Sequence, residues 1–448
     1  MRNDFMALVA FCSASMTYGS VGSWAHPRTD PGVVDPDYYI NLARALERGG
    51  FDVLFFDDRL AMPSSYGNTP RATAKFGSRA VKLDLTTILA LVSAHTTRLG
   101  LGATYSTTYY DPYHVARLFA TLDHMTRGRA VWNIVTSVNK AEAENFGVDY
   151  TVHDQRYDRA DEFLEVVTQL WESWERDALE MNRETGVFAN PDKVHEINYE
   201  GQYVKSRGPL TVPQPPQGWP VLLQAGQSGR GMQFAGRWAD MIFTAPSSFE
   251  SAQTQYAKQA EHSAAAGRSG KPGLVLPAMV VCVGETSEIA HRRHEYFHAL
   301  ASPEEELIFL SEQANFDFSI FGLDEPLPAD ILDRVTGVRG LIEKYINDVR
   351  AEHGPDATLR QMAERLCRNT TSSTIVGDPV EVADVLEHWF QNHAADGFVI
   401  VPTDDPGGYE DFGRLVVPEL RRRGLVRPVE QAGLSLRQRL GLPDRASR

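Results

Sequence analysis

A glycine-rich turn at residues 224–231 has the composition of a phosphate-binding loop. Its sequence, Gln-Ala-Gly-Gln-Ser-Gly-Arg-Gly, follows an apolar run and leads into a helical pattern. Glycines let successive backbone N–H groups turn toward an anion, Gln227 and Ser228 offer polar side chains, and a helix N-terminus adds partial positive charge. The turn has neither the GxGxxG spacing of a dinucleotide site nor the lysine of a P-loop. A phosphate cradle and an ordinary tight connection between strand and helix both fit these residues.

A second pair of residues with anion-binding chemistry stands at the start of a predicted helix. His153 and Tyr157 are separated by about one helical turn, so both side chains lie on the same side of that helix. An imidazole and a phenol in this arrangement can donate hydrogen bonds to one phosphate group. Capping of the helix by Asp154 and simple packing of Tyr157 are the alternatives.

Small polar side chains also end several predicted strands. Asp58, Thr104, Asn133 and Thr136 have the size and polarity to hydrogen-bond the N–H and C=O edge of a heterocycle. Asn133 follows Trp132 inside a strand, where an unpaired amide is costly, so a ligand or a neighbouring group must satisfy it. These residues are candidate contacts to a ring, and internal pairing of Asn133 is the alternative.

Aromatic side chains gather in the same predicted loops and strand ends. We expect Phe11, Tyr18, Phe56 and Tyr105 to line a mostly apolar pocket. No dense group of arginine or lysine accompanies them in the loops. An apolar or aromatic substrate is therefore favoured over a tricarboxylate.

A competing motif is the HExxH pattern of His294, Glu295 and His298. On a helix this spacing places two imidazoles on one face to hold zinc, with the glutamate as general base. The residues that follow do not continue a metzincin pattern, because Ala301 stands where that pattern needs glycine. A zinc metallopeptidase is the alternative function that this motif suggests.

The elements that must position these residues are short apolar runs that alternate with longer helical patterns. Such alternation predicts parallel βα units closed into a (β/α)₈ TIM barrel, with a doubly wound open sheet as the alternative. In a barrel the loops after the strands carry the chemistry, which is where the polar groups above occur. The predicted strands are Phe5–Phe11, Val53–Asp57, Leu99–Thr104, Ala130–Thr136, Pro220–Ala225, Met241–Thr244, Pro277–Val283 and Gly397–Val401.

Two long segments interrupt the alternation inside what we expect to be a single domain, 1–448. Residues 173–219 are rich in proline near their end and predict a rim insertion. Residues 301–360 predict extra helices that form a lid. Both insertions are expected over the C-terminal mouth of the barrel.

Composition excludes several classes of protein. The formal net charge of −15 opposes nucleic-acid binding. Cys12, Cys282 and Cys367 are far apart, which fits neither a disulfide framework nor a thiolate zinc site. No apolar run reaches the roughly eighteen residues of a membrane span, and the first apolar run fits a core strand better than a signal peptide. We expect a cytoplasmic protein that binds neither nucleic acid nor membrane and holds no metal.

Several motifs together resemble the bacterial luciferase-like flavin monooxygenases. Within that superfamily the chain is most similar to the branch that contains nitrilotriacetate monooxygenase and dibenzothiophene sulfone monooxygenase. The motifs that carry the resemblance are Tyr109–Arg117, Gly128-Arg129, Trp132–Ser137, Asn145-Phe146-Gly147, His153–Tyr157 and Gln224–Gly231.

The resemblance implies a monooxygenase that uses reduced FMN (FMNH₂) and O₂, with a flavin C4a-peroxide as oxygen donor. It further implies a separate NAD(P)H:FMN reductase as partner and a homo-oligomer. The family's FMN positions correspond to Asp58 and Thr104 on the ring side and to His153, Tyr157 and Ser228 at the phosphate, and we add Asn133 and Gln227 from the pattern above.

The substrate is left open by the resemblance. The first predicted loop, Ser13–Ser23, contains no histidine and one large polar ring, Tyr18, which favours a small apolar aromatic such as an aryl sulfone or a halogenated ring. A flavin-binding barrel without turnover is a further alternative to the enzyme.

Overall fold

The structure, a computed structural model, describes most of the chain. The described residues are 4–13, 23–149, 153–268, 273–300, 302–368, 373–428 and 433–445. Of the predicted site residues, Tyr18 lies outside these ranges, and only the backbone of His153 is described.

Eight parallel strands close into a barrel, and their order around the ring follows the chain. Closure comes from the pairing of β13 with β1 and of β10 with β11. The predicted barrel is confirmed, and each predicted strand corresponds to one barrel strand. These are β1 (Ala7–Ser13), β2 (Val53–Asp57), β3 (Gly100–Ser106), β4 (Ala130–Val135), β9 (Val221–Gln224), β10 (Met241–Thr244), β11 (Leu274–Val283) and β13 (Gly397–Pro402).

Alternation along each strand divides the apolar residues between two layers. On β2, Val53 and Phe55 belong to the cluster inside the barrel, whereas Leu54 and Phe56 belong to the cluster between the barrel and its helices. Successive side chains of a strand point to opposite faces, so each strand contributes to both layers. Because both faces are buried, the strands read as continuous apolar runs in the sequence.

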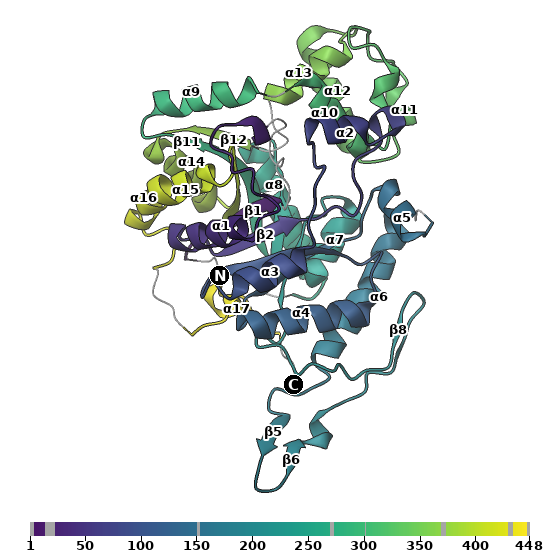
Figure 1. The fold of residues 1–448 in the computed structure, drawn as a ribbon, viewed down its shortest axis with the longest axis vertical. Coiled ribbons are helices and arrows are strands. Elements are labelled where there is room, and N and C mark those ends of the chain that lie inside the picture. Colours follow the sequence, from purple (N-terminus) through teal and green to yellow (C-terminus); the bar gives the residue numbers. More distant parts are fainter. Residues whose placement is uncertain are drawn as a thin grey trace.

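Helices surround the ring of strands, as Figure 1 shows. Within the described residues, no helix has the length and apolar character needed to cross a membrane. The helices outside the second insertion are α1 (Pro36–Gly49), α2 (Arg71–Phe76), α3 (Leu85–Ser93), α4 (Pro112–Thr126), α5 (Lys140–Phe146), α6 (His153–Trp171), α7 (Gly229–Trp238), α8 (Phe249–Ala265), α9 (Ser287–His298), α14 (Pro379–Gln391), α15 (Gly407–Asp411), α16 (Val417–Arg422) and α17 (Leu436–Arg439), with a π-helical turn at Phe412–Val416.

The sheet that forms the ring has one further strand, β12 (Ser373–Gly377), which was not predicted. β12 pairs with the second half of β11, from Met279 to Val283. The first half of β11 pairs with β10 and its middle with β13. β11 pairs with different strands along successive parts of its length. It is therefore longer than the predicted strand, which began at Pro277.

Residues 173–219 form two small antiparallel hairpins. The pair β5–β6 projects from the body of the molecule in Figure 1. The second pair, β7–β8, is shorter. The four strands are β5 (Leu179–Asn182), β6 (Val187–Ala189), β7 (Tyr199–Glu200) and β8 (Lys205–Ser206).

This first insertion lies at the opposite end of the barrel from the one predicted. It joins the end of α6 to the start of β9, and the Gln217 amide Nε2 donates to the carbonyl of Ala130, at the start of β4, over 3.0 Å. An insertion between a helix and the next strand stands where strands begin. Residues 173–219 therefore flank the N-terminal end of the barrel, and the expectation that they cover the C-terminal mouth is wrong.

The second insertion contains four helices with an apolar cluster of their own. They are α10 (Pro303–Ala314), α11 (Ile331–Arg334), α12 (Arg339–His353) and α13 (Leu359–Arg368). Two contacts tie this unit to loops that follow barrel strands. The Asp317 carboxylate accepts from Gly67 N–H over 2.8 Å, and Glu312 Oε1 accepts from Asn139 Nδ2 over 3.1 Å. The four helices thus stand on the C-terminal side of the barrel.

The N-terminal end of the barrel is closed by the last helix of the chain. Leu436 of α17 and Leu440, directly after it, are fully buried in the same cluster as the inward side chains of the strands. Next to them, the Arg437 guanidinium donates to Asp240 Oδ2 over 2.7 Å and to the carbonyl of Trp219. The C-terminal segment is therefore part of the barrel core.

Asp240 is the centre of a buried charge network. Its side chain has no exposed surface and lies 3.2 Å from a guanidinium nitrogen of Arg445 as well as beside Arg437. Burial disfavours the carboxylate, but the charges of Arg437 and Arg445 outweigh it and lower the pKa of Asp240 to about 2. Asp240 therefore stays ionised at neutral pH.

We expect Asp240→Asn to destabilise the protein by about 3–5 kcal/mol, because removal of one partner leaves buried guanidinium charge uncompensated. Chemical denaturation and calorimetry at pH 7 measure this loss. Asp444→Asn is the matched control: its carboxylate forms an exposed pair with Arg176, which should be worth less than about 1 kcal/mol. Equal stability of the two variants would contradict the role given to Asp240.

Candidate functional site

An amide and a hydroxyl meet inside the mouth of the barrel. Asn133 on β4 and Thr104 on β3 are register partners, and Asn133 Nδ2 donates to Thr104 Oγ1 over 2.8 Å. Thr104 Oγ1 in turn donates to the carbonyl of Phe56 over 2.7 Å. Asn133 is 6% exposed, and its Oδ1 has no hydrogen-bond partner in the described part of the chain. A buried acceptor in this position is available to a ligand N–H.

The glycine-rich turn leads directly into α7. Ser228 caps this helix, and its Oγ accepts the N–H of Gly231 over 3.0 Å. Gln227 and Ser228 are exposed, so the turn opens toward solvent at the C-terminal end of β9. The N-terminus of α7 gives this turn a partial positive charge, which is the charge that attracts an anion.

Tyr157 of α6 is held against this turn. Burial raises the pKa of its phenol, which keeps the hydroxyl protonated at neutral pH. A Cβ placed on Gly226 would lie 2.5 Å from Tyr157 Oη, so only glycine permits the approach. The side chains of Thr136, Gln224 and Ser228 lie near this phenol and partly oppose the rise in its pKa.

Gln224, at the end of β9, is a second buried amide at this point. Its side chain is 3% exposed, and Oε1 has no hydrogen-bond partner among the described residues. The C-terminal end of the barrel thus has two buried amide oxygens, from β4 and β9, that the described chain leaves unsatisfied. Asn133 pairs with the inward Leu223 and Gln224 with the outward Ile134, so the two amides lie on opposite faces of the sheet, Asn133 inside the barrel and Gln224 beneath the glycine-rich turn.

Asp58 follows β2 and is half-buried. Its Oδ1 accepts the N–H of Arg59 over 2.8 Å. Burial raises the pKa of Asp58 to about 7, against the opposing effects of that N–H and of Lys82. The carboxyl group is therefore protonated in part of the molecules at neutral pH and can donate as well as accept.

A cavity of about 370 Å³ lies beside Asp58 and is lined mainly by the loop that follows β2. Arg59, Arg79 and Lys82 are among its lining residues, which corrects the expectation that no cationic group accompanies the aromatic residues. Each cation faces a carboxylate. Lys82 Nζ donates to Asp57 Oδ1 over 2.6 Å, and Arg59 Nη1 lies 3.1 Å from Glu312 Oε1.

The uppermost layer inside the barrel is aromatic. Phe11 lies on β1, with its ring 4.7 Å from that of Phe55 and 5.7 Å from that of Phe243, measured between centroids. Ser13 and Asp57, two residues further along β1 and β2, both contact Lys82 at the cavity. These rings form an aromatic floor, which adjoins the polar cavity.

Two predicted pocket residues lie on the outer side of their strands. Phe56 is fully buried against Tyr39 of α1, with ring centroids 6.0 Å apart. Tyr105 stacks on Tyr110 at 4.5 Å and belongs to the same outer layer. Because alternate side chains point to opposite faces, Phe55 takes the inward position that was given to Phe56.

The sequence reasoning missed Gln224 and the three cations of the cavity. Gln224 was part of the predicted turn but was not chosen, although a glutamine at the end of an apolar run carries the same signal as Asn133. Arg59, Arg79 and Lys82 are scattered along one loop and meet only in three dimensions.

The HExxH motif lies on α9, away from this group of residues. The two imidazoles do approach, with 2.9 Å between their Nε2 atoms, but Glu295 is exposed. Burial and the neighbouring His298 lower the pKa of His294 to about 4. Within the described residues, no third histidine, cysteine, aspartate or glutamate completes a metal-binding group.

A (β/α)₈ barrel with a glycine-rich turn, a cavity and unsatisfied amides at its C-terminal end has the arrangement of a barrel enzyme that acts on small molecules. The family model for luciferase-like monooxygenases matches residues 16–397, so the chain belongs to this family of flavin-dependent monooxygenases.

Relatives match almost the whole chain. Dibenzothiophene-sulfone monooxygenase of Rhodococcus erythropolis is 42% identical, covering 98% of this chain and 96% of the relative. Nitrilotriacetate monooxygenase component A of Aminobacter aminovorans is 40% identical over 94% and 93%. A solved structure of riboflavin lyase, with modified FMN and its substrate riboflavin, has a TM-score of 0.87 at 30% identity and covers 98% of this chain and 96% of the other.

The raised pKa of Asp58 predicts a specific dependence of stability on pH. The unfolded carboxyl has a pKa of about 3.9, so between about pH 4 and 7 the folded chain holds more protons than the unfolded chain. The unfolding free energy of the wild type should therefore fall with rising pH by roughly 1–2 kcal/mol relative to Asp58→Asn. Denaturation of both proteins across this range measures the difference, and parallel curves would contradict it.

Proposed function

We propose that this chain is the oxygenase of a two-component system. It takes reduced FMN from a separate NAD(P)H:FMN reductase and uses O₂ to oxidise a small apolar, aromatic substrate such as an aryl sulfone or a halogenated ring. A relative that is named a component A and a structural neighbour that contains modified FMN support this division of labour and this cofactor.

The observation that carries the proposal is the turn at 224–231 with Tyr157 against it. The phenol is buried and keeps its proton. It lies so close to glycines of the turn that a Cβ there would collide with its oxygen. Ser228 Oγ is bonded to the N–H of Gly231 at the start of α7. The phosphate of FMN would be held here by Tyr157, Ser228, Gln227 and His153, with the helix N-terminus adding favourable charge.

The ring of the cofactor would be held further inside the mouth. Asn133 Oδ1 offers an unsatisfied acceptor for a ring N–H, and Thr104 fixes the orientation of the amide by accepting from its Nδ2. Asp58, with a pKa of about 7, can donate its carboxyl proton to a ring oxygen or accept from a ring N–H. Bound reduced flavin supplies the electrons with which O₂ is activated, while the chain orients the reactants and excludes water.

The substrate would lie between the aromatic floor and the polar cavity. Phe11 and Phe55 give an apolar surface for a flat ring system, and the cations of the cavity can donate to the oxygens of a polar head group. A sulfone has these two parts in one molecule. The 42% identical dibenzothiophene-sulfone monooxygenase acts on such a compound, which supports this substrate class.

The helices α10–α13 would act as a lid within a single 1–448 domain. Glu312 of α10 binds Arg59 and Asn139 from two mouth loops, so closure of this unit would depend on the same charges that line the cavity. A closed mouth protects reactive oxygen species from water. We also propose a homo-oligomer in the cytoplasm, where NAD(P)H is available to the reductase.

The test is an anaerobic titration of the full chain with reduced FMN, followed by aerobic turnover with an added flavin reductase, NADH and dibenzothiophene sulfone. Tight binding of reduced FMN, together with O₂ uptake matched by substrate loss, is the expected result. If hydrogen peroxide forms while neither aryl sulfones nor halogenated aromatics are consumed, the proposed substrate class is wrong. Failure to bind reduced FMN would refute the whole proposal.

Tyr157→Phe should weaken the affinity for reduced FMN by about tenfold, because one hydrogen bond to a charged phosphate is lost. Fluorescence or absorbance titration under anaerobic conditions measures the change. The matched control is Tyr199→Phe. Tyr199 lies on the first insertion, and its hydroxyl donates to Glu165 of α6, so this variant also removes a phenol oxygen that contacts α6. If both variants bind FMN as the wild type does, Tyr157 is not a phosphate ligand.

A further inference from the structure

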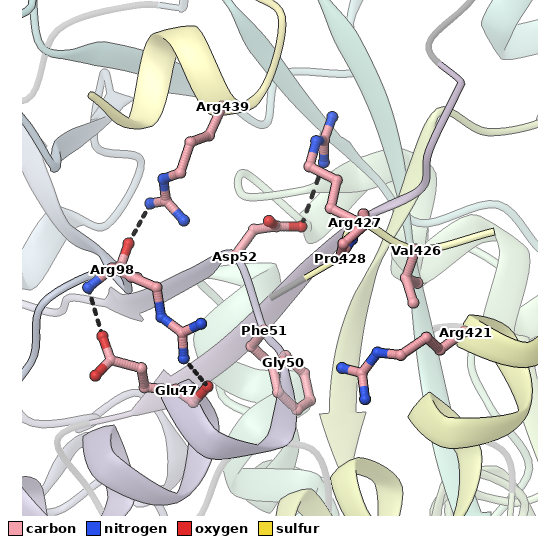
Figure 2. A pocket seen from close by; sticks show the side chains of 10 residues that line it. All are labelled: Glu47, Gly50, Phe51, Asp52, Arg98, Arg421, Val426, Arg427, Pro428 and Arg439. Atoms are coloured by element: carbon pink, nitrogen blue, oxygen red, sulfur yellow. Dashed lines mark hydrogen bonds and ion pairs between the residues drawn. The ribbon is translucent and has the colours of Figure 1, made fainter. Parts of the chain in front are cut away.

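A second group of cations lies at the N-terminal end of the barrel, opposite the mouth. Four arginines line a cavity of about 50 Å³ there: Arg98, Arg421, Arg427 and Arg439. The cavity adjoins the residues that lead into β2, and Arg98 stands just before β3. Figure 2 shows the guanidinium groups of Arg98 and Arg421 reaching toward it from opposite sides. We call it the four-arginine pocket.

The two carboxylates in this pocket do not balance the four cations. Glu47 Oε1 accepts the backbone N–H groups of Thr97 and Leu99 over 2.8 and 2.9 Å, and that of Arg98 as well. Asp52 Oδ2 accepts the N–H of Leu8 over 2.9 Å. Both carboxylates are thus occupied by backbone donors, and the side chains that line the pocket carry an excess of two positive charges.

The guanidinium of Arg427 has an unused donor. Its Nη1 is buried and has no hydrogen-bond partner in the described part of the chain. The nearest carboxylate oxygen, Asp52 Oδ2, is 3.7 Å away, which is too long for a hydrogen bond. A buried charged donor without an acceptor is costly, so an acceptor from outside the chain would be stabilising.

The arginines also disfavour one another. Burial lowers the pKa of the Arg439 guanidinium; Asp52 opposes this shift, and the charges of Arg427 and Arg98 add to it. Arg421 is exposed at the end of α16, and its guanidinium has no hydrogen-bond or ion-pair partner among the described residues. The pocket therefore combines mutual repulsion with free donors.

We propose that the four-arginine pocket is a binding site for a tetrahedral oxyanion, a phosphate or sulfate group. Guanidinium groups match such an anion in charge and in the geometry of paired N–H donors. The cavity of about 50 Å³ has room for roughly three to five water-sized positions, which is the extent of one such ion. The group would come either from the free inorganic ion or from a phosphate monoester.

An anion there would join parts of the chain that are distant in sequence. Arg98 precedes β3, Arg421 belongs to α16, Arg427 to the segment after it, and Arg439 to α17, which closes the barrel. A bound oxyanion would thus fasten the C-terminal segment and raise the stability of the folded chain in proportion to its occupancy. This effect is independent of the proposed flavin site.

The experiment titrates the full chain with inorganic phosphate at constant ionic strength, by calorimetry and by thermal unfolding, with sulfate and glycerol phosphate as parallel ligands. Saturable binding and a rise in Tm of about 2–4 °C at saturation are expected. Tighter binding of glycerol phosphate than of phosphate would identify a monoester as the occupant, and the reverse order the free ion.

Substitutions separate this pocket from the proposed flavin-phosphate turn. Arg421→Gln should weaken phosphate binding about tenfold, and Arg427→Gln should abolish it. Arg422→Gln is the matched control, because its guanidinium binds Glu419 and does not line the pocket. Arg421 is exposed, so its variant remains informative if Arg427→Gln does not fold.

Several outcomes would overturn the proposal. Binding that is unaffected by Arg421→Gln and Arg427→Gln but lost in Tyr157→Phe would assign the phosphate to the flavin turn. Absence of saturable binding in the wild type would also refute it.

Discussion

The closure of eight parallel strands into one ring is the constraint on which the rest of the molecule depends. Inward side chains then share a narrow interior, and a large residue on one strand requires a small one beside it. A Cβ on Gly102 of β3 would lie 2.7 Å from the Cβ of Phe55, so the aromatic floor exists because β3 has no side chain at that point. The same closure brings the C-terminal ends of all strands together, which is how Asn133, Asp58 and the turn at 224–231 come to surround one mouth.

Polar groups have different roles at the two ends of this ring. The N-terminal end is sealed by α17 and by the buried pair of Asp240 and Arg437, and its polar groups serve stability. The C-terminal end keeps buried amide oxygens unsatisfied, at Asn133 and Gln224, which costs stability. A site for chemistry is expected where such costs are tolerated, and barrel enzymes place it at this end. An anion in the four-arginine pocket would thus strengthen the attachment of the C-terminal segment to the barrel and would not affect the reaction.

Local signals were sufficient for much of the fold and for part of the site. Strands and the glycine-rich turn could be located because each is encoded within a few consecutive residues. The sequence did not show which side chains of β2 point into the barrel. Val53 to Phe56 are all apolar, and a strand that is buried on both faces has no alternation of apolar and polar residues. The first insertion was assigned to the wrong end, although its position after a helix and before a strand indicates the N-terminal end of the barrel. Arg59, Arg79 and Lys82 became one group only when the loop after β2 was folded around the cavity.

Two adjacent carboxyl groups at the mouth illustrate how the fold assigns different roles to the same chemistry. Burial would raise the pKa of Asp57, but Lys82 and Arg79 outweigh it and lower that pKa, so Asp57 is a fixed anion. Asp58 lacks such a close cation, and burial raises its pKa to about 7. Pairs of titratable groups driven apart in this way are typical of sites that move or share protons. Lys82 and Arg59 of the cavity are already paired with Asp57 and Glu312, so an anionic guest would first have to displace an internal ion pair. The proposed sulfone substrate is neutral and offers hydrogen-bond acceptors, and it would leave these pairs in place.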